Sequence, residues 1–476
     1  RDTDRSRGLG DVYKRQLLGI FIVSCDDDTF TMSSSAVLSF SADTVNVDTI
    51  FSNTPSSMRS FWVYNRNDAG LRCTSVRLER GNQSGFRVNV RGEYLGAEVG
   101  YQTNNIELYK GDSLRVFVEV TPKTQREPGP QLIEDKLTFL LENGVSQTVC
   151  LKAYSWNAKT FDKLDITRDT TIYDANPILI RGGIHVSQGA TLQIQAGTTL
   201  YFNSQAGIEV DGTLRSLGTK DAPVVLRGSR LDRMFPYLPY DRVSGQWQGI
   251  KFNAESYEND IEYTDIHGAF NGIVADSADI DKTKLSIRQS TIHNCRGVGL
   301  SLNYVKAIVE NCQITNTLLP CVYVKGGDVT INHSTIAQFY PFDGNRKQAF
   351  TIESPIARLL CRNSIITGYS DDEINGLTAE DCHFKFETCI IRTPKIVTKD
   401  SIYFINVVYE DIADTIRFGK KHFKTIDTRN LVYDFSLDSI SGAIDKADPA
   451  TSLPIDRHGI PRDPKPDIGA FEYKQQ

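Results

Sequence analysis

The chain of 476 residues is long enough for two or three domains, and its 40% hydrophobic and 24% charged content is ordinary for a soluble protein with buried cores. A formal net charge of −6, with no basic stripe, argues against nucleic acid as a partner. The 35 Gly, 23 Phe and 20 Tyr, against three Met and three Trp, favour many short strands joined by tight turns.

The chain begins with a segment that we exclude from the folded domains. Residues 17–23 (LLGIFIV) form an apolar run that stops at Ser24 and Cys25. This run is too short to span a bilayer as a helix, but its length is typical of the centre of a signal peptide. Residues 1–16 lack the initial Met and short basic stretch of a signal peptide, so we expect a non-native leader there, followed by a signal remnant and tether at residues 17–35.

The residues around Cys25 resemble the lipobox of bacterial lipoproteins, in the series Ile22-Val23-Ser24-Cys25. In that family the cysteine thiol receives a diacylglycerol, which anchors the protein because each buried methylene adds roughly 0.8 kcal/mol of membrane affinity. The resemblance implies lipidation at Cys25 and an outer membrane as partner. The following Asp26-Asp27-Asp28 resembles a surface-export signal of Bacteroidota lipoproteins, and a simple polar tether is the alternative.

Residues 36–157 show short alternating strands separated by turn signals such as Glu142-Asn143-Gly144. Seven such strands predict an Ig-like β-sandwich. Cys73 and Cys150 both fall in this segment, either as a disulfide or as two free thiols. The segment shows no catalytic cluster, and we interpret it as a spacer or docking module.

Residues 158–440 contain an internal repeat, which predicts a right-handed parallel β-helix. Six segments align without gaps and lie 26, 22, 22, 30 and 25 residues apart, in the range typical of solenoids. One column of the alignment is invariant isoleucine and predicts an aliphatic ladder inside the coils. The ladder consists of Ile266, Ile292, Ile314, Ile336, Ile366 and Ile391.

Two further columns of the repeat are mostly polar. The column of small side chains contains Thr264, Ser290, Cys312, Ser334, Ser364 and Cys389. The column of larger side chains contains Tyr263, Gln289, Asn311, His333, Asn363 and Thr388. We expect both columns to satisfy backbone groups at the bend of each coil.

Several motifs resemble right-handed parallel β-helix lipoproteins of Bacteroidota, a group that also carries an Ig-like N-terminal segment. They include Gly245-Gln-Trp-Gln-Gly-Ile250, and Asp456-Arg-His-Gly459 through Pro466-Asp-Ile-Gly-Ala-Phe-Glu472. The resemblance implies an all-β fold, a capping segment at residues 441–476 and an outer-membrane lipoprotein at the cell surface, or otherwise one facing the periplasm. It brings no established activity and no catalytic residues.

The acidic residues do not form a recognisable catalytic pair. Asp276, Asp279 and Asp281 could hold Ca²⁺ through carboxylate oxygens, but solvated turns are the simpler interpretation. We therefore predict neither a metal site nor a cofactor. The seven histidines are scattered; His267 and His293 each follow a ladder isoleucine and could stack on one outward face.

Two insertions, at residues 230–245 and 340–347, carry aromatic side chains that could stack on sugar rings, and Trp247 lies just beyond the first; burial is the more common role of such side chains. The candidates are Phe235, Tyr237, Tyr240, Trp247, Tyr340 and Phe342. The leading hypothesis is a surface-anchored, non-catalytic protein that presents a binding face to glycan or protein partners. The alternative is a polysaccharide lyase or glycoside hydrolase acting on an acidic or complex polysaccharide.

Overall fold

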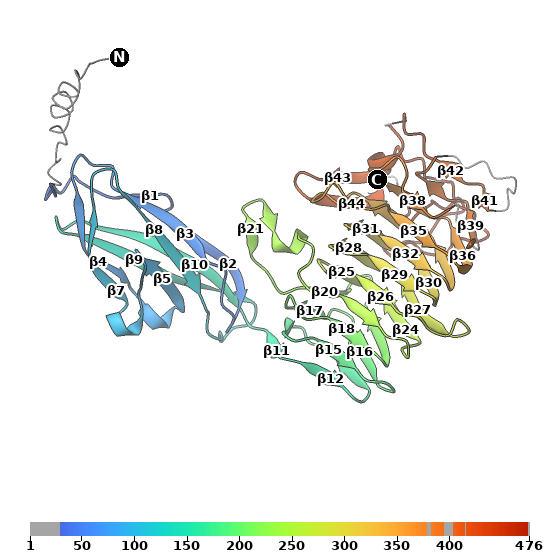
Figure 1. The fold of residues 1–476 in the computed structure, drawn as a ribbon, viewed down its shortest axis with the longest axis horizontal. Helices are drawn as coiled ribbons and strands as arrows, with labels where there is room; N and C mark the ends of the chain where they lie inside the picture. Colours follow the sequence, from blue (N-terminus) through green and yellow to red (C-terminus); the bar gives the residue numbers. More distant parts are fainter. Residues whose placement is uncertain (1–28, 378–381, 395–402, 415, 475–476) are drawn as a thin grey trace, which may run out of the picture. The chain divides into compact units, whose positions relative to one another are not determined.

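A computed structural model describes residues 29–377, 382–394, 403–414 and 416–474 (Figure 1). The chain divides into two units, Arg1–Trp156 and Asn157–Gln476, each of which is described by itself. Cys25 and the three aspartates after it lie outside the described residues. No helix in the described ranges has the length and hydropathy to cross a membrane.

The first unit is a pair of five-stranded sheets that share one apolar core. Neighbouring strands run antiparallel, except that β10 pairs with β2 in parallel. In chain order the elements are β1 (Ser39–Phe40), β2 (Thr44–Phe51), β3 (Arg59–Tyr64), β4 (Leu71–Leu78), η1 (Gly81–Gln83), β5 (Phe86–Val90), β6 (Glu93–Tyr94), η2 (Ala97–Val99), β7 (Gln102–Leu108), β8 (Ser113–Val120), β9 (Pro130–Leu141) and β10 (Ser146–Trp156).

Cys73 and Cys150 of the first unit are both thiols in the structure. Cys73 is buried in the core between the sheets and Cys150 is half-buried on β10. Burial raises the pKa of the Cys73 thiol to about 12, so this side chain behaves as a small apolar residue. Of the two alternatives that the sequence leaves open, the structure contains the free thiols.

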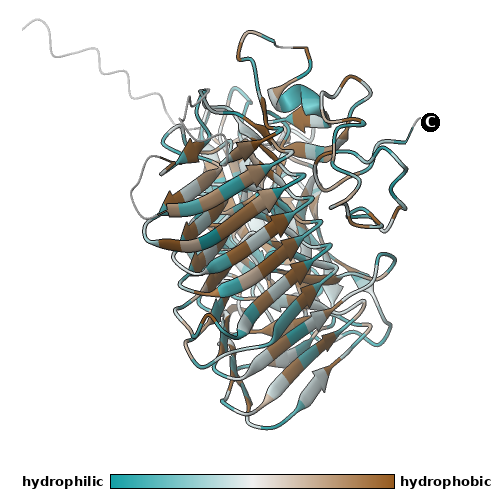
Figure 2. Ribbon diagram, turned by 90° about the vertical axis from the view of Figure 1, so that its right-hand side faces the viewer, coloured by the Kyte–Doolittle hydropathy of each residue, from teal (hydrophilic) through white to brown (hydrophobic). Residues whose placement is uncertain are grey.

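The second unit is a parallel β-helix. Successive coils contribute strands to three parallel sheets of eleven, nine and ten strands, which enclose one apolar core. Figure 2 shows the strands stacked one above another, with hydrophobic and hydrophilic residues alternating along many of them. Side chains alternate between the two faces of a strand, so each coil buries one set by stacking on its neighbours.

The three sheets have the following strands. The eleven-stranded sheet contains β11 (Lys159–Phe161), β14 (Ile178–Ile180), β17 (Thr199–Phe202), β20 (Val224–Gly228), β25 (Thr264–His267), β28 (Thr291–Cys295), β31 (Gln313–Thr317), β34 (Thr335–Gln338), β37 (Ile365–Gly368), β40 (Ile390–Ile391) and β42 (Val408–Tyr409). The nine-stranded sheet contains β12 (Leu164–Ile166), β15 (Ile184–Val186), β18 (Ile208–Val210), β23 (Ile250–Phe252), β26 (Ile273–Ala275), β29 (Leu300–Asn303), β32 (Val322–Lys325), β35 (Phe350–Glu353) and β38 (Ile374–Asn375). The ten-stranded sheet contains β13 (Thr170–Ile172), β16 (Thr191–Gln195), β19 (Thr213–Leu217), β24 (Asn259–Glu262), β27 (Thr283–Arg288), β30 (Lys306–Glu310), β33 (Asp328–Asn332), β36 (Ile356–Arg362), β39 (Cys382–Glu387) and β41 (Phe404–Ile405). Two hairpins and two short helices lie outside these sheets: β21 (Arg233–Phe235) with β22 (Leu238–Pro239), η3 (Tyr240–Arg242), η4 (Gly419–His422), and β43 (Phe423–Asp427) with β44 (Val432–Leu437).

The six repeat isoleucines lie on consecutive strands of the eleven-stranded sheet. Each is the register partner of the next, from Ile266 paired with Ile292 through to Ile366 paired with Ile391. The column continues towards the N-terminus as Leu226 and Leu200. All six isoleucines are at most 1% exposed, so the column is a continuous part of the core.

The column of small side chains bonds neighbouring coils to each other. The backbone N–H of Thr264 donates to Ser290 Oγ at 3.1 Å, and that of Ser334 donates to Ser364 Oγ at 3.0 Å. These donors lie at the corner between the ten-stranded and eleven-stranded sheets, where strand pairing stops. The hydroxyls therefore satisfy buried backbone groups that would otherwise lack partners.

The column of larger side chains has a different role from the one we expected. All six of its residues have positive φ, between 41° and 52°, so each coil makes the same left-handed turn at this corner. At least three of these side chains form hydrogen bonds to the C-terminal segment, which is the part of the chain after β42, and not to the backbone of their own coil. Asn311 donates to Ile455 O at 2.8 Å, His333 Nε2 lies 2.9 Å from Ser452 Oγ, and Asn363 Oδ1 accepts from the Asp448 N–H at 2.9 Å.

The C-terminal segment runs along the outer face of the eleven-stranded sheet. Its apolar residues, from Phe423 on β43 to Phe471, form a second core with Ala337, Ile365 and Ile390 of that sheet. The covering therefore begins before residue 441, where the sequence placed the start of a cap. The covering extends this far because the outward-facing side chains on β34, β37 and β40 are apolar, and packing against the C-terminal segment removes them from water.

Substitutions on β33 test which side chains of the repeat point into the core and which point outward. Ile331 is fully buried, so Ile331→Asp should cost at least roughly 4 kcal/mol of unfolding free energy through a lost core contact and an unpaired buried charge. Thr330→Asp is the matched control, because Thr330 is half-buried and its hydroxyl accepts from Arg358. Denaturant unfolding should show the control within about 0.5 kcal/mol of wild type. Equal damage from both changes would contradict the assignment.

A buried ion pair tests the docking of the C-terminal segment. Arg462 and Glu472 lie 3.0 Å apart with side chains 2% and 3% exposed. Arg462→Met should cost roughly 3–5 kcal/mol, because it leaves the Glu472 carboxylate buried without its cation. Adding Glu472→Gln should recover most of that loss in thermal unfolding. Lys465→Met, at an exposed neighbour, serves as the control, and an equal effect of Arg462→Met and Lys465→Met would refute the docking role.

Candidate functional site

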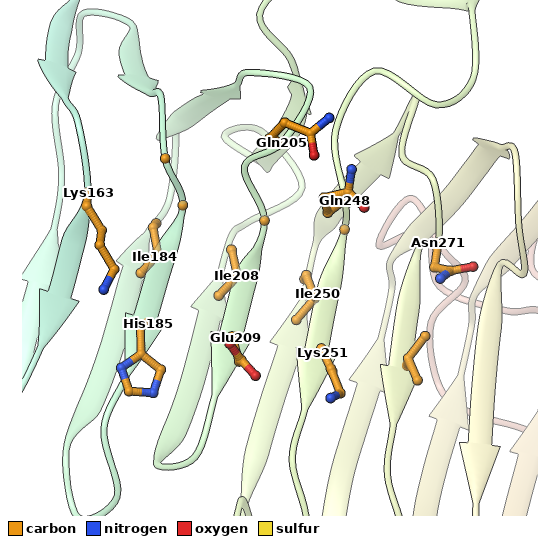
Figure 3. A pocket seen from close by; sticks show the side chains of 15 residues that line it. Lys163, Ile184, His185, Gln205, Ile208, Glu209, Gln248, Ile250, Lys251 and Asn271 are labelled. Atoms are coloured by element: carbon orange, nitrogen blue, oxygen red, sulfur yellow. The ribbon is translucent and has the colours of Figure 1, made fainter.

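A groove lies on the outer face of the nine-stranded sheet. It has a volume of about 520 Å³ and extends from Lys163, just before β12, across β15, β18 and β23 to Val274 on β26 (Figure 3). The groove lies in the first coils, where the outward-facing side chains of the nine-stranded sheet are mostly polar. The outer face of the eleven-stranded sheet is instead covered by the C-terminal segment. The groove is the candidate site for a ligand on this solenoid.

Glycines form the floor of the groove. Gly183, Gly207 and Gly249 stand directly before β15, β18 and β23, and the backbone N–H of Ile208 donates to Gly249 O at 2.9 Å. Gly249 has φ of 89°, and a Cβ there would lie 1.7 Å from Asn271 O. The carbonyl of the next coil occupies the place of a side chain at this corner, so the glycines allow consecutive coils to approach each other closely.

Two rows of polar side chains form the walls. One row consists of the amides Gln205, Gln248 and Asn271, and the other of Lys163, His185, Glu209 and Lys251, while the isoleucines between them point into the core (Figure 3). Each row takes its residues from successive coils, and only the first row repeats one chemical group, the amide. Amides and mixed charges of this kind suit ligands with many hydroxyl groups.

Ion pairs on the far side of the second row orient its charged groups. Lys163 Nζ lies 3.0 Å from Asp165, His185 Nε2 lies 2.8 Å from Asp211, and Lys251 Nζ lies 3.4 Å from Asp276. The groove and these partners together contain two lysines and four acidic residues, so acidic groups predominate around the groove.

Two carboxylates of this region share one amide. Asn253 Nδ2 donates to Glu209 Oε1 at 3.1 Å and to Asp211 Oδ1 at 2.8 Å. Hydrogen bonds from His185 and Asn253 lower the pKa of Asp211. A depressed pKa makes Asp211 a poor proton donor at neutral pH, although it stays competent as a base.

The exposed aromatic candidates lie on the insertions, apart from the groove residues. Phe235 and Tyr237 form a stacked pair at the tip of the β21–β22 hairpin, 49% and 66% exposed, with ring centroids 5.7 Å apart. Phe342 is also exposed. Tyr240 is half-buried, and the Arg230 guanidinium covers one face of its ring at 3.7 Å.

Trp247 and Tyr340 are not glycan-stacking residues, and here the structure corrects the sequence interpretation. Trp247 is fully buried, stacks on Phe202 at 4.4 Å and donates its indole N–H to His267 O. Tyr340 is 4% exposed, and its hydroxyl lies 2.8 Å from Ser244 Oγ. Both rings serve packing, since neither face is free for a sugar.

The acidic run at residues 276–281 is a turn. Asp276 pairs with Lys251, and Asp279 Oδ1 accepts from the Asp281 N–H at 3.0 Å. A calcium site would need several oxygens converging on one point. No such convergence of these three aspartates is seen in the described part of the chain.

A Ser–His–Glu arrangement in the C-terminal segment has the order of a catalytic triad but lies in the interior. His422 Nδ1 lies 2.9 Å from Ser441 Oγ, and His422 Nε2 lies 3.1 Å from Glu410 Oε1. His422 is 0% exposed, Glu410 5% and Ser441 8%. The serine hydroxyl also accepts from the Ala443 N–H, so this network stabilises the fold and offers no accessible nucleophile.

Comparisons with known proteins do not assign the chain to a family. No family model matches the chain, and neither does any curated protein sequence. Among solved structures, the chain has limited similarity to the VesB protease of Vibrio cholerae (18% identity, TM-score 0.17, covering 25% of this chain and 31% of that one). It has similarly limited similarity to a family 123 glycoside hydrolase from Clostridium perfringens (7% identity, TM-score 0.18, covering 27% of this chain and 30% of that one). The third is an ASH/PapD-like domain of human CEP192 (11% identity, TM-score 0.17, covering 26% of this chain and 87% of that one). TM-scores this low carry no argument about fold or function, so the site must be interpreted from its own geometry.

Proposed function

We propose that the protein is a surface-anchored, non-catalytic β-helix protein that binds an extended, hydroxyl-rich glycan along the groove of the nine-stranded sheet. The observation that carries the proposal is the pair of polar rows, to which successive coils of the nine-stranded sheet each contribute side chains in one groove. Strands stack about 4.8 Å apart, a repeat comparable to the length of one sugar unit in an extended glycan. A repeating ligand can therefore place one sugar unit against each coil and make hydrogen bonds to the amides Gln205, Gln248 and Asn271.

The proposed anchor and spacer complete this picture. The apolar run at residues 17–23 and Cys25 support a lipoprotein of the outer membrane, and Asp26 to Asp28 support export to the cell surface. The two-sheet first unit, which we interpret as an Ig-like domain, would act as a spacer between the anchor and the solenoid. Weak binding at each groove would suffice, because many copies on one surface act together.

A glycoside hydrolase is the second candidate function, and one observation favours it. Glu209 and Asp211 both accept from Asn253 Nδ2, which keeps the two carboxylates close together beside the groove. Retaining glycosidases use a carboxylate pair about 5–5.5 Å apart. Such an enzyme also needs a proton donor with a raised pKa, and Asp211 has a lowered one.

Glycan binding is tested by a glycan array followed by calorimetry on the best ligand. The double variant Gln248→Ala/Lys251→Ala should lose affinity about tenfold or more, because each lost hydrogen bond is worth roughly 1 kcal/mol. Phe235→Ala/Tyr237→Ala is the control and should bind like wild type. Loss of binding in the control alone would move the site to the hairpin, and a blank array would remove the glycan proposal.

Catalysis is tested on the same glycans by release of reducing ends. The proposal expects no release by the wild-type protein. Release that disappears in Glu209→Gln, in a variant that still binds the glycan, would replace the binding function with hydrolysis.

Lipidation is tested by metabolic labelling with palmitate in a bacterium that processes lipoproteins, from a gene with a complete signal sequence. The wild-type protein should be labelled and fractionate with membranes, whereas Cys25→Ala should be unlabelled and released. A variant that keeps its label would remove the anchor from the proposal.

A further inference from the structure

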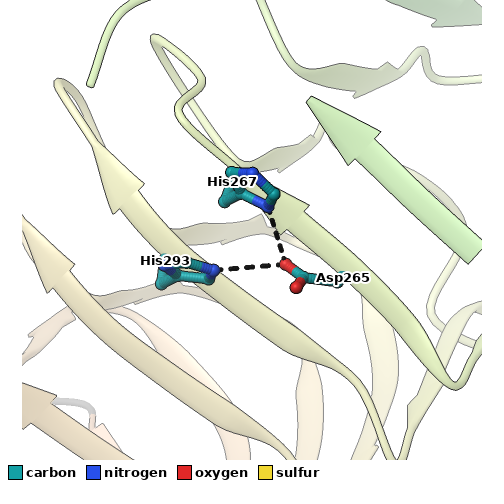
Figure 4. A group of neighbouring side chains, drawn as sticks. All are labelled: Asp265, His267 and His293. Atoms are coloured by element: carbon teal, nitrogen blue, oxygen red, sulfur yellow. Dashed lines mark hydrogen bonds and ion pairs between the residues drawn. The ribbon is translucent and has the colours of Figure 1, made fainter. Parts of the chain in front are cut away.

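Two histidines and an aspartate converge on the outer face of the eleven-stranded sheet, at the coils of β25 and β28. His267 Nδ1 lies 3.0 Å from Asp265 Oδ1, and His293 Nε2 lies 3.2 Å from the same oxygen (Figure 4). His267 and His293 are register partners, and their rings stack with centroids 4.9 Å apart. Among the residues that the structure describes, this is the group whose ligand atoms all lie within 4.8 Å of one another.

The outer partners of His267 have the arrangement found around metal-binding histidines. Its Nε2 lies 3.0 Å from Asp241 Oδ1 on η3, and Arg227 lies 2.7 Å from that same oxygen. A carboxylate on one ring nitrogen fixes the tautomer and directs the lone pair of the other nitrogen towards a metal. Here that lone pair would point from Nδ1 at the Asp265 carboxylate, a contact that is favourable only with a proton or a cation between the two atoms.

The charges of the cluster favour a cation at this point. The carboxylates of Asp265 and Asp241 each lie 3.0 Å from a ring nitrogen of His267, so negative charge flanks this ring on both sides. The side chains of Asp265 and His293 are 33% and 26% exposed, whereas His267 is buried.

We propose that Asp265 Oδ1, His267 Nδ1 and His293 Nε2 bind a zinc ion, with a fourth coordination position open to water or to a ligand oxygen. Zinc takes nitrogen ligands at about 2.0–2.1 Å and carboxylate oxygens at about 2.0–2.2 Å, so tetrahedral ligand atoms lie about 3.3 Å apart. The 3.0 and 3.2 Å separations from Asp265 Oδ1 need only a small adjustment to reach that spacing. Two imidazoles with one carboxylate favour zinc and similar transition metals over calcium or magnesium.

The site would cross-link two consecutive coils and the insertion between β20 and β23. Asp265 and His267 belong to β25 and His293 to β28, while Asp241 comes from the insertion. The cluster faces away from the groove residues of the nine-stranded sheet, so it is a separate site and does not depend on the proposed glycan function.

The test is metal binding by the full chain after removal of bound metal with a chelator. The wild-type protein should take up one equivalent of Zn²⁺ in competition with a chromophoric chelator, and Co²⁺ in its place should show visible absorption of a four-coordinate site. His293→Ala should abolish this uptake. Asp241→Asn, which changes only the outer partner, should weaken affinity roughly 10- to 100-fold.

A matched control separates this site from histidine–carboxylate pairs in general. His185 also bonds an aspartate, Asp211, but on the nine-stranded sheet, so His185→Ala should bind Zn²⁺ like wild type. Circular dichroism of each variant establishes that the β-helix is intact. Absence of uptake by the wild-type protein, or uptake that survives in a folded His293→Ala variant, would overturn the proposal.

Discussion

The in-register stacking of identical side chains is the constraint on which the second unit depends. Each coil is too thin to bury its own apolar residues, so it must place them directly above those of its neighbour. The isoleucine column achieves this across six consecutive coils, because each isoleucine is the register partner of the next. Once this register is established, residues that are distant in sequence, such as Glu209 and Lys251, become neighbours on the outer faces. The groove and the histidine cluster are both consequences of that register.

The repeat was predictable from the sequence because it is a local pattern copied without gaps. Ile266 and Ile292 occupy the same position of a six-residue segment, and a buried ladder tolerates little variation there. The left-handed turn at the larger polar column had a weaker signal in Asn311, His333 and Asn363, since Asn and His accept positive φ more readily than most residues. Their bonds to the C-terminal segment had no local signal at all.

The candidate site was much less predictable, for two physical reasons. The groove residues His185, Glu209 and Lys251 occupy equivalent positions of successive coils but share no residue type, so no repeat marks them. Asp241 meets His267 only because an insertion folds back onto the sheet. The aromatic candidates were judged by residue type and by their place near insertions. Trp247 shows the limit of that reasoning, because it bridges to Ala269 and fills the core beside Phe202.

The docked C-terminal segment changes how such a solenoid comes apart. In a simple repeat array each coil interacts with its two neighbours, so end coils can fray while the middle stays folded. Here Arg457 bonds Thr291, Arg462 bonds Asn311, and Thr451 bonds Asn363, so one short stretch of chain contacts three coils at once. This stretch adds links between coils beyond the contacts of each coil with its two neighbours. A protein truncated before it would lose these links, and its solenoid would open more readily from the C-terminal end.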